Sequence, residues 1–254
     1  MYELHTTLRP GPYRYELARG MKGTDVAALQ LNFPELLIDG DFGQRTQRRV
    51  ALFQRRHGIE PIGIAGVMTQ AKLIAVHSQS AARRYELPRR FLYSKASKES
   101  GLKVAAYAKH PNDWGFDLGT FQLAFGPNHR PATQQGFAAA YDIAATAEGL
   151  AKGAREDYER FLHGAAVEQG CRYGTELAVG GDYSPQIFAW QLVALVHNWP
   201  AAAEHIAALG RAYVEEGRDD RPEDWIVEAS GGRLSTPRDW ILDYVPGATA
   251  YVRW

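Results

Sequence analysis

One glutamate, Glu99, stands where a carboxylate is unfavourable. It follows Leu92 and Ala96 at the helical spacing i, i+4 and i+7, which places it on the face that should point inward. It also falls in the last turn of the expected helix, where the helix dipole disfavours negative charge. Both effects penalise the ionised form, and a carboxyl group kept neutral can donate a proton near neutral pH. Glu99 is therefore a candidate general acid.

The helix that should carry Glu99 has recognisable ends. Pro88 suits the first turn, where its missing N–H is no loss, and Gly101 suits the left-handed residue just past a helix end. We therefore expect a helix from roughly Pro88 to Ser100. Short extended segments with polar turns follow between residues 104 and 123, and they fit a small β-hairpin beside this helix. Its glycines would let the backbone approach a ligand closely.

Bulk composition narrows the function classes. The 254 residues suffice for two domains, and 45% hydrophobic with 23% charged residues is typical of a soluble globular protein. Lys plus Arg and Asp plus Glu both number 29, which argues against a nucleic-acid or membrane-surface binder driven by overall charge. Cys171 is the only cysteine, so we expect neither a disulfide within the chain nor a thiolate metal site, and no cofactor. We also expect no signal peptide and no membrane-spanning helix.

The N-terminal third carries an internal repeat. Two glycines, a threonine and an apolar residue recur 23 residues later: Gly40, Gly43, Thr46 and Val50, then Gly63, Gly66, Thr69 and Leu73. Each copy predicts a tight glycine turn that leads into a helix. Thr24 is a good N-cap for an earlier helix, and the middle helix, about Thr46 to His57, should bury Phe53. The pattern predicts three short helices ending near residue 76.

This repeat, with Leu29-Gln30, Asp39-Gly40-Asp41-Phe42-Gly43 and Phe53-Gln54 in register, resembles the peptidoglycan-binding domain of cell-wall hydrolases over roughly residues 14 to 76. The resemblance implies a peptidoglycan-binding domain at residues 1–76 without showing which atoms touch the wall. Most of the repeated positions are expected to be turn and core residues. The candidates for wall contact are Asp39, Phe42 and Gln30.

The rest of the chain is predicted to be mainly helical. Residues 77–86 are polar and are expected to form a linker or a short connecting helix, and residues 87–254 a second domain. Asp142 can cap a helix that runs to Phe161, and residues 186–198 are apolar nearly all round, as a central helix would be. The expected fold class is mainly α: a three-helix domain followed by a helical domain with a small β-hairpin.

The second domain carries three segments that resemble those of lytic transglycosylases and goose-type lysozymes, which share the lysozyme-like fold: Glu99-Ser100-Gly101, Gly119-Thr120-Phe121-Gln122-Leu123 and Val196-His197-Asn198-Trp199-Pro200. The resemblance covers roughly residues 87 to 200. It implies that Glu99 is the catalytic acid and that Gln122 contacts the substrate. His197 replaces the usual tyrosine, which leaves open the group that orients Glu99. The further candidate substrate contacts are Gly119, His197, Asn198 and Ser100.

Two mechanisms stay open. Hydrolysis of a glycosidic bond needs two carboxylates, and the second would be Asp117 or Asp113, although a local turn hydrogen bond is the simpler role for Asp113. Lytic transglycosylation, which the resemblance implies first, needs Glu99 alone to cleave the MurNAc-β-1,4-GlcNAc bond. The alternative without catalysis is a structural protein that anchors to the wall.

The two-module layout resembles that of modular phage endolysins. This resemblance implies that the protein waits in the host cytoplasm and needs a pore-forming partner, a holin, to reach the periplasmic cell wall. Its substrate would be the glycan strands of peptidoglycan. We expect a monomer that does not bind nucleic acid.

Overall fold

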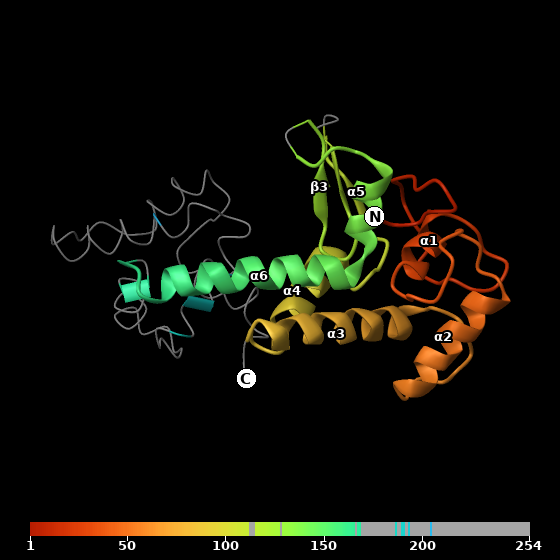
Figure 1. The fold of residues 1–254 in the computed structure, drawn as a ribbon, viewed down its shortest axis with the longest axis horizontal. Helices are drawn as coiled ribbons and strands as arrows, with labels where there is room; N and C mark the ends of the chain where they lie inside the picture. The colour runs from red at the N-terminus through yellow and green to blue at the C-terminus, as the bar shows by residue number, and fades with distance from the viewer. Residues whose placement is uncertain are drawn as a thin grey trace. The chain divides into compact units, whose positions relative to one another are not determined.

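The computed structural model describes residues 1–111, 115–127, 129–165, 167–168, 186, 189–190, 193 and 204. Within these residues the protein is mainly α-helical with one small sheet, as predicted (Figure 1). The chain divides into two compact units. The first contains Met1–Arg84 and Leu92–Ala151, and the second contains Tyr85–Phe91 and the residues from Lys152 onward.

Three helices form the N-terminal part of the first unit: α1 (Thr24–Gln30), α2 (Gln44–Arg56) and α3 (Val67–Arg84). In α2 the residues Val50 and Phe53 recur at helical spacing and are buried, as predicted. Gly40 and Gly63 begin the turns before α2 and α3 with φ of 69° and 73°, a conformation that glycine adopts without steric penalty. The predicted three helices joined by glycine turns are confirmed.

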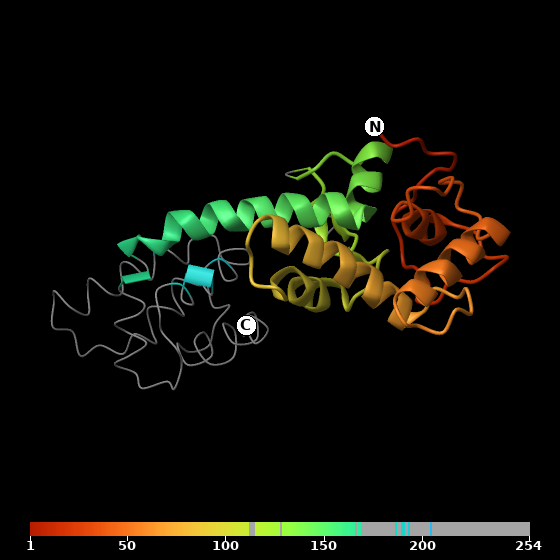
Figure 2. The same ribbon diagram turned by 60° about the horizontal axis from the view of Figure 1, so that its bottom comes forward.

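Helix α3 extends beyond the predicted domain. Residues 77–84, expected to begin a linker or a short connecting helix, continue it to Arg84. Ser78, Ala81 and Ala82 are buried there. Figures 1 and 2 both show α3 running beside the first part of α6 (Ile143–Leu162), and Arg84 Nη1 lies 2.8 Å from Glu148 Oε1. The small side chains let the connection pack as a regular helix, although it carries no strong apolar stripe.

Helix α4 (Phe91–Ser100) carries Glu99. It begins later than the predicted Pro88, after a turn in which the Phe91 N–H donates to the Pro88 carbonyl at 2.9 Å. It ends as predicted, because Gly101 has φ of 60° and its N–H donates to the Ser97 carbonyl at 3.0 Å.

A three-stranded antiparallel sheet follows, in the order β1 (Tyr107–Lys109), β2 (Phe116–Leu118) and β3 (Leu123–Phe125). The sequence predicted a hairpin here, and the third strand completes the sheet. Phe116 and Phe125 stack with ring centroids 5.5 Å apart. Phe137 of α5 (Gln134–Tyr141) lies 6.0 and 5.4 Å from these two rings, so aromatic side chains fasten the sheet to α5.

Helix α6 begins with the predicted cap, since Asp142 Oδ1 accepts a hydrogen bond from the Ala145 N–H at 2.9 Å. In the second unit, Trp190 stacks on Tyr158 of α6 at 4.3 Å. Most of the helix predicted for residues 186–198 lies outside the described residues. Within the residues that the structure describes, none of the helices combines the length and apolar character needed to cross a membrane.

Candidate active site and wall-binding domain

Glu99 lies in the last turn of α4 with 23% of its side chain exposed. Leu92 and Ala96, which precede it at helical spacing, are exposed by only 1% and 0%. The carboxylate therefore stands at the edge of the buried face, as the spacing predicted. Its Oε1 atom lies 3.6 Å from Nζ of Lys95, one turn earlier on the same helix.

Lys95 belongs to the candidate site, although no sequence motif marked it. Its side chain is only 14% exposed, and burial lowers the pKa of the ammonium group to about 8, although the neighbouring Glu99 opposes the shift. The i, i+4 spacing of Lys95 and Glu99 is the sequence feature that could have identified this pair. This order of charges is the less favourable one on an isolated helix. The pair places a cation and a carboxylate together at one half-buried helix end.

The segment after Glu99 is held by the N-terminal part of the first unit. The Tyr15 hydroxyl donates to the Gly101 carbonyl at 3.3 Å. Gln70 of α3 accepts from the Val104 N–H at 3.0 Å and donates to the Tyr15 carbonyl at 2.6 Å. These bonds fix the end of the helix that carries Glu99 to the three-helix region.

Other predicted substrate contacts have structural partners. Ser100 is 8% exposed, and its hydroxyl donates to the Ala96 carbonyl at 2.8 Å. A Cβ atom at Gly119, where φ is 79°, would lie 2.0 Å from the Ala140 carbonyl oxygen. The close backbone approach expected at Gly119 is therefore to helix α5. Gln122 adopts φ of 50°, unusual for a residue other than glycine, and its side chain donates to the Gly119 carbonyl at 2.9 Å.

Asp117, one candidate for the second carboxylate, lies in the middle of β2. Its Oδ2 atom is 2.8 Å from Nε2 of His110, and the two side chains are 24% and 32% exposed. In the sequence, His110 is marked only by its place among the extended segments and polar turns expected between residues 104 and 123. A carboxylate that contacts one ring nitrogen orients an imidazole, so the pair is a candidate base. The structure thus gives the two carboxylates different neighbours, Lys95 for Glu99 and His110 for Asp117. Three predicted site residues lie outside the described residues: Asp113, His197 and Asn198.

Two glutamines hold the glycine turns of the N-terminal repeat. Gln30 accepts from the Gly40 N–H at 2.9 Å, and Gln54 accepts from the Gly63 N–H at 2.8 Å. The Nε2 group of each glutamine also donates to the threonine near the start of the next helix, at 3.2 and 2.9 Å. The two copies therefore share their hydrogen bonds as well as their residue types.

The structure gives the three candidates for wall contact roles inside the domain. Phe42 and Gln30 are exposed by 0% and 2%, so neither side chain reaches the surface, and both serve the core and the turn instead. Asp39 is half-buried, and its Oδ1 accepts from Gln30 Nε2 at 2.8 Å and from the Asp41 N–H at 2.9 Å. All three candidates thus have a role within the repeat itself.

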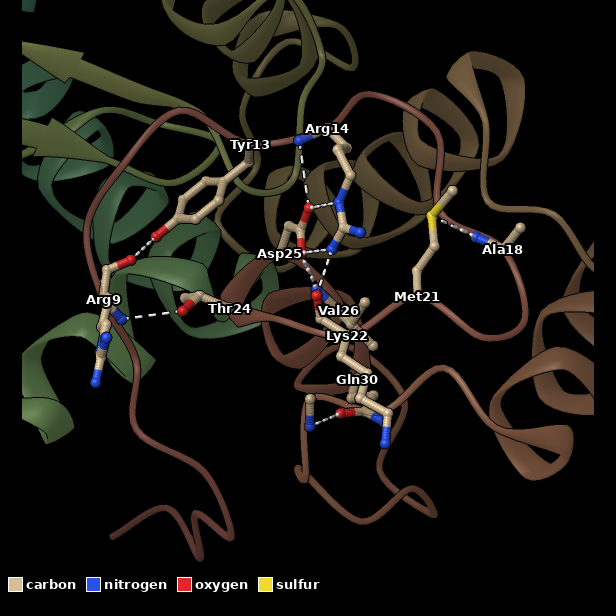
Figure 3. Close-up of polar contacts among 11 residues, drawn as sticks. Arg9, Tyr13, Arg14, Ala18, Met21, Lys22, Thr24, Asp25, Val26 and Gln30 are labelled. Atoms are coloured by element: carbon tan, nitrogen blue, oxygen red, sulfur yellow. Dashed lines mark hydrogen bonds and ion pairs between the residues drawn. The ribbon is translucent and has the colours of Figure 1, made fainter.

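The segment before α1 is tied to that helix by an ion pair (Figure 3). Two nitrogens of the Arg14 guanidinium donate to the Asp25 carboxylate at 2.7 Å each, and the Asp25 side chain is only 4% exposed. This hydrogen bonding raises the pKa of Arg14. The predicted side-chain cap at Thr24 is wrong: Gly23 takes the N-cap position, and the Thr24 hydroxyl accepts from the Arg9 N–H at 3.0 Å.

The two turns, each held by a glutamine, and the helices that follow them form a small repeated helical module. Residues 23–73 match the family model described as "Putative peptidoglycan binding domain". The N-terminal part of the chain therefore contains a peptidoglycan-binding domain, as the resemblance predicted, and peptidoglycan is a partner of the protein. A comparison of the chain with curated proteins finds no match. In the described part of the chain, no three His, Cys, Asp or Glu side chains gather where they could hold a metal ion.

Proposed function

We propose that the protein is a cell-wall lytic enzyme that cleaves the MurNAc-β-1,4-GlcNAc bond by lytic transglycosylation, with Glu99 as its acid and then its base. The observation that carries this proposal is the attachment of the Glu99 helix end to the peptidoglycan-binding region through Tyr15 and Gln70. Wall bound by one part of a compact unit is kept at high local concentration near a carboxylate in the same unit.

In the proposed reaction Glu99 first gives its proton to the glycosidic oxygen, and the bond between that oxygen and C1 of MurNAc breaks. The Glu99 carboxylate then accepts the proton of the MurNAc C6 hydroxyl, whose oxygen attacks C1 and closes a 1,6-anhydro ring. One carboxyl group serves both steps. The Lys95 ammonium, 3.6 Å away, stabilises the carboxylate that exists between them.

A second candidate is hydrolysis, and the contact between Asp117 and His110 favours it. Hydrolysis needs a base or nucleophile besides the acid, and a half-buried carboxylate fixed by an imidazole is suited to that role. Hydrolysis consumes one water for each bond that it cleaves, whereas transglycosylation consumes none. Mass spectrometry of the released muropeptides therefore distinguishes the two reactions, because anhydro products are lighter by one water.

The substitution Glu99→Gln tests the proposal. It keeps the size of the side chain and removes the transferable proton, so the rate of turbidity loss of a peptidoglycan suspension should fall about 100-fold or more. Glu156→Gln is the matched control, because Glu156 on α6 is exposed and pairs with Lys152 in the same i, i+4 arrangement. Wall lysis by the folded Glu99→Gln protein would overturn the assignment, and a wild-type protein that binds wall without product release would indicate the anchoring alternative.

A second experiment tests how the wild-type protein reaches the wall. As part of the proposal, the enzyme waits in the host cytoplasm and reaches the wall through a membrane pore, as a phage endolysin does. Production of the wild-type protein in bacteria should lyse cells only when a pore-forming protein is made with it. Lysis without the pore would contradict this route.

A further inference from the structure

Helix α2 carries a concentration of positive charge that has no role in the proposed lytic reaction. Its 13 residues include five arginines, and no acidic residue occurs between residues 42 and 58. At 3.6 residues per turn, all five arginines fall within an arc of about 120°. The buried residues of the helix, among them Val50 and Phe53, occupy the opposite side. This surface, which we call the arginine face, consists of Arg45, Arg48, Arg49, Arg55 and Arg56.

Most of the arginine face lacks an acidic partner. Arg49 lies 2.8 Å from Glu35, and its side chain is 19% exposed. The other four arginines are exposed and form no ion pair with the described residues. The positive field also reaches His57, whose pKa is lowered by burial and then by Lys72 and Arg56. A solvated helix face usually mixes both signs of charge, so five cations on one side of a chain of zero net charge indicate an anionic partner.

We propose that the arginine face of α2 binds the free carboxylate groups of peptidoglycan stem peptides. The whole of α2 lies within residues 23–73, which match the peptidoglycan-binding family. The sugars of the glycan strand offer hydroxyl and amide groups, whereas the stem peptides carry the carboxylates of the polymer. A guanidinium group pairs with a carboxylate through two parallel hydrogen bonds, and a face about 20 Å long can hold several such pairs.

The inference rests on the peptidoglycan-binding domain and not on the lytic step. It can therefore be tested with protein that carries Glu99→Gln, so that the wall is not digested during the measurement. Release of soluble sugar is followed in parallel: digestion by this protein would contradict the proposed function of Glu99 without affecting a comparison of initial binding.

The binding experiment uses insoluble peptidoglycan freed of attached polymers. Arg48→Gln with Arg55→Gln should raise the dissociation constant about three- to tenfold, since each exposed ion pair contributes modestly, and should make binding less sensitive to salt. The control is Arg83→Gln with Arg89→Gln, which removes the same charge from exposed positions outside α2 and should leave the constant unchanged. Arg48→Lys with Arg55→Lys keeps the charge but not the two parallel hydrogen bonds, so its affinity should lie between those of the parent and the glutamine variant. Arginine and glutamine have similar helix propensities, so both double variants should fold.

Two further arms identify the anion. On peptidoglycan whose carboxylates have been converted to neutral amides by carbodiimide coupling with methylamine, the Arg48→Gln, Arg55→Gln protein and its Glu99→Gln parent should bind equally. Equal affinity of these two proteins for intact peptidoglycan would overturn the proposal, as would an unchanged arginine dependence on the amidated peptidoglycan. A loss of affinity for duplex DNA without any loss for peptidoglycan would also overturn it, because the face would then serve a nucleic acid.

Discussion

Lys95 and Glu99 lie together at one half-buried end of α4, and the carboxylate affects the pKa of the lysine. Burial of the Lys95 ammonium group is unfavourable, which is why its pKa falls to about 8 from an ordinary value of 10.5. The Glu99 carboxylate offsets part of that penalty at a distance of 3.6 Å. Removing one member of such a pair leaves the other without its partner, so a substitution at Lys95 also acts on Glu99.

Lys95 should make stability depend on pH in the alkaline range. The folded pKa is below the unfolded value of 10.5, so between about pH 8 and 10.5 the unfolded chain binds more protons. The free energy of unfolding should therefore gain about 2 kcal/mol from this residue as the pH rises from 8 to 10. Chemical denaturation of wild type and Lys95→Met at several pH values measures the effect, and the difference between the two proteins should change by that amount.

The control for this prediction is Lys152→Met. Lys152 and Glu156 of α6 are spaced like Lys95 and Glu99, but their side chains are 65% and 68% exposed. Because the Lys152 side chain is exposed, Lys152→Met removes a lysine with the same spacing to a glutamate without removing a buried charge. Parallel curves for wild type and Lys95→Met would show that Lys95 keeps its ordinary pKa.

At the scale of the elements, the turn between β2 and β3 depends on one glycine. Gly119 has φ of 79°, and an added Cβ would meet the Ala140 carbonyl oxygen at 2.0 Å. Gly119→Ala should therefore lower the free energy of unfolding by about 2 kcal/mol or more, through backbone strain and displacement of α5. Gly149→Ala in α6, where an added Cβ meets no atom within 4 Å, should instead stabilise the protein by about 0.5–1 kcal/mol. Thermal unfolding checks both, and equal effects of the two substitutions would contradict the packing argument.

The elements that the sequence predicted well are those with local causes. Buried residues at helical spacing located α2, and the glycine after Ser100 located the end of α4. The failures have long-range causes. Gly119 was expected to approach a ligand, but its neighbour is Ala140, 21 residues away, and no local pattern reveals that contact. Likewise the contact of His110 with Asp117 depends on the pairing of β1 with β2, which the residue types alone do not determine.

At the scale of the molecule, the peptidoglycan-binding region does not stand alone. The first unit joins Met1–Arg84 to Leu92–Ala151, and side-chain amides make much of the connection. Gln134 exchanges two hydrogen bonds with the backbone of Leu8, at 2.6 and 2.8 Å. Gln135 does the same with Tyr2, at 2.9 and 3.1 Å. Wall binding and the proposed chemistry thus belong to one packed body.

A substitution at Asn32 tests whether these parts of the first unit unfold together. Asn32 is 5% exposed and bridges α1 to the junction of α5 and α6. It donates to the Tyr141 carbonyl and accepts from the Ile143 N–H, at 2.9 Å each. Asn32→Ala leaves both backbone groups buried without this partner, so the free energy of unfolding should fall by about 2–4 kcal/mol. In hydrogen exchange, peptides from α1 and from β2 should lose protection together, because one unit opens as a whole. Gln44→Ala, at an exposed position of α2, should change neither. If α1 lost protection while β2 kept its own, the two regions would unfold separately, and wall binding could not hold the Glu99 helix in place through packing.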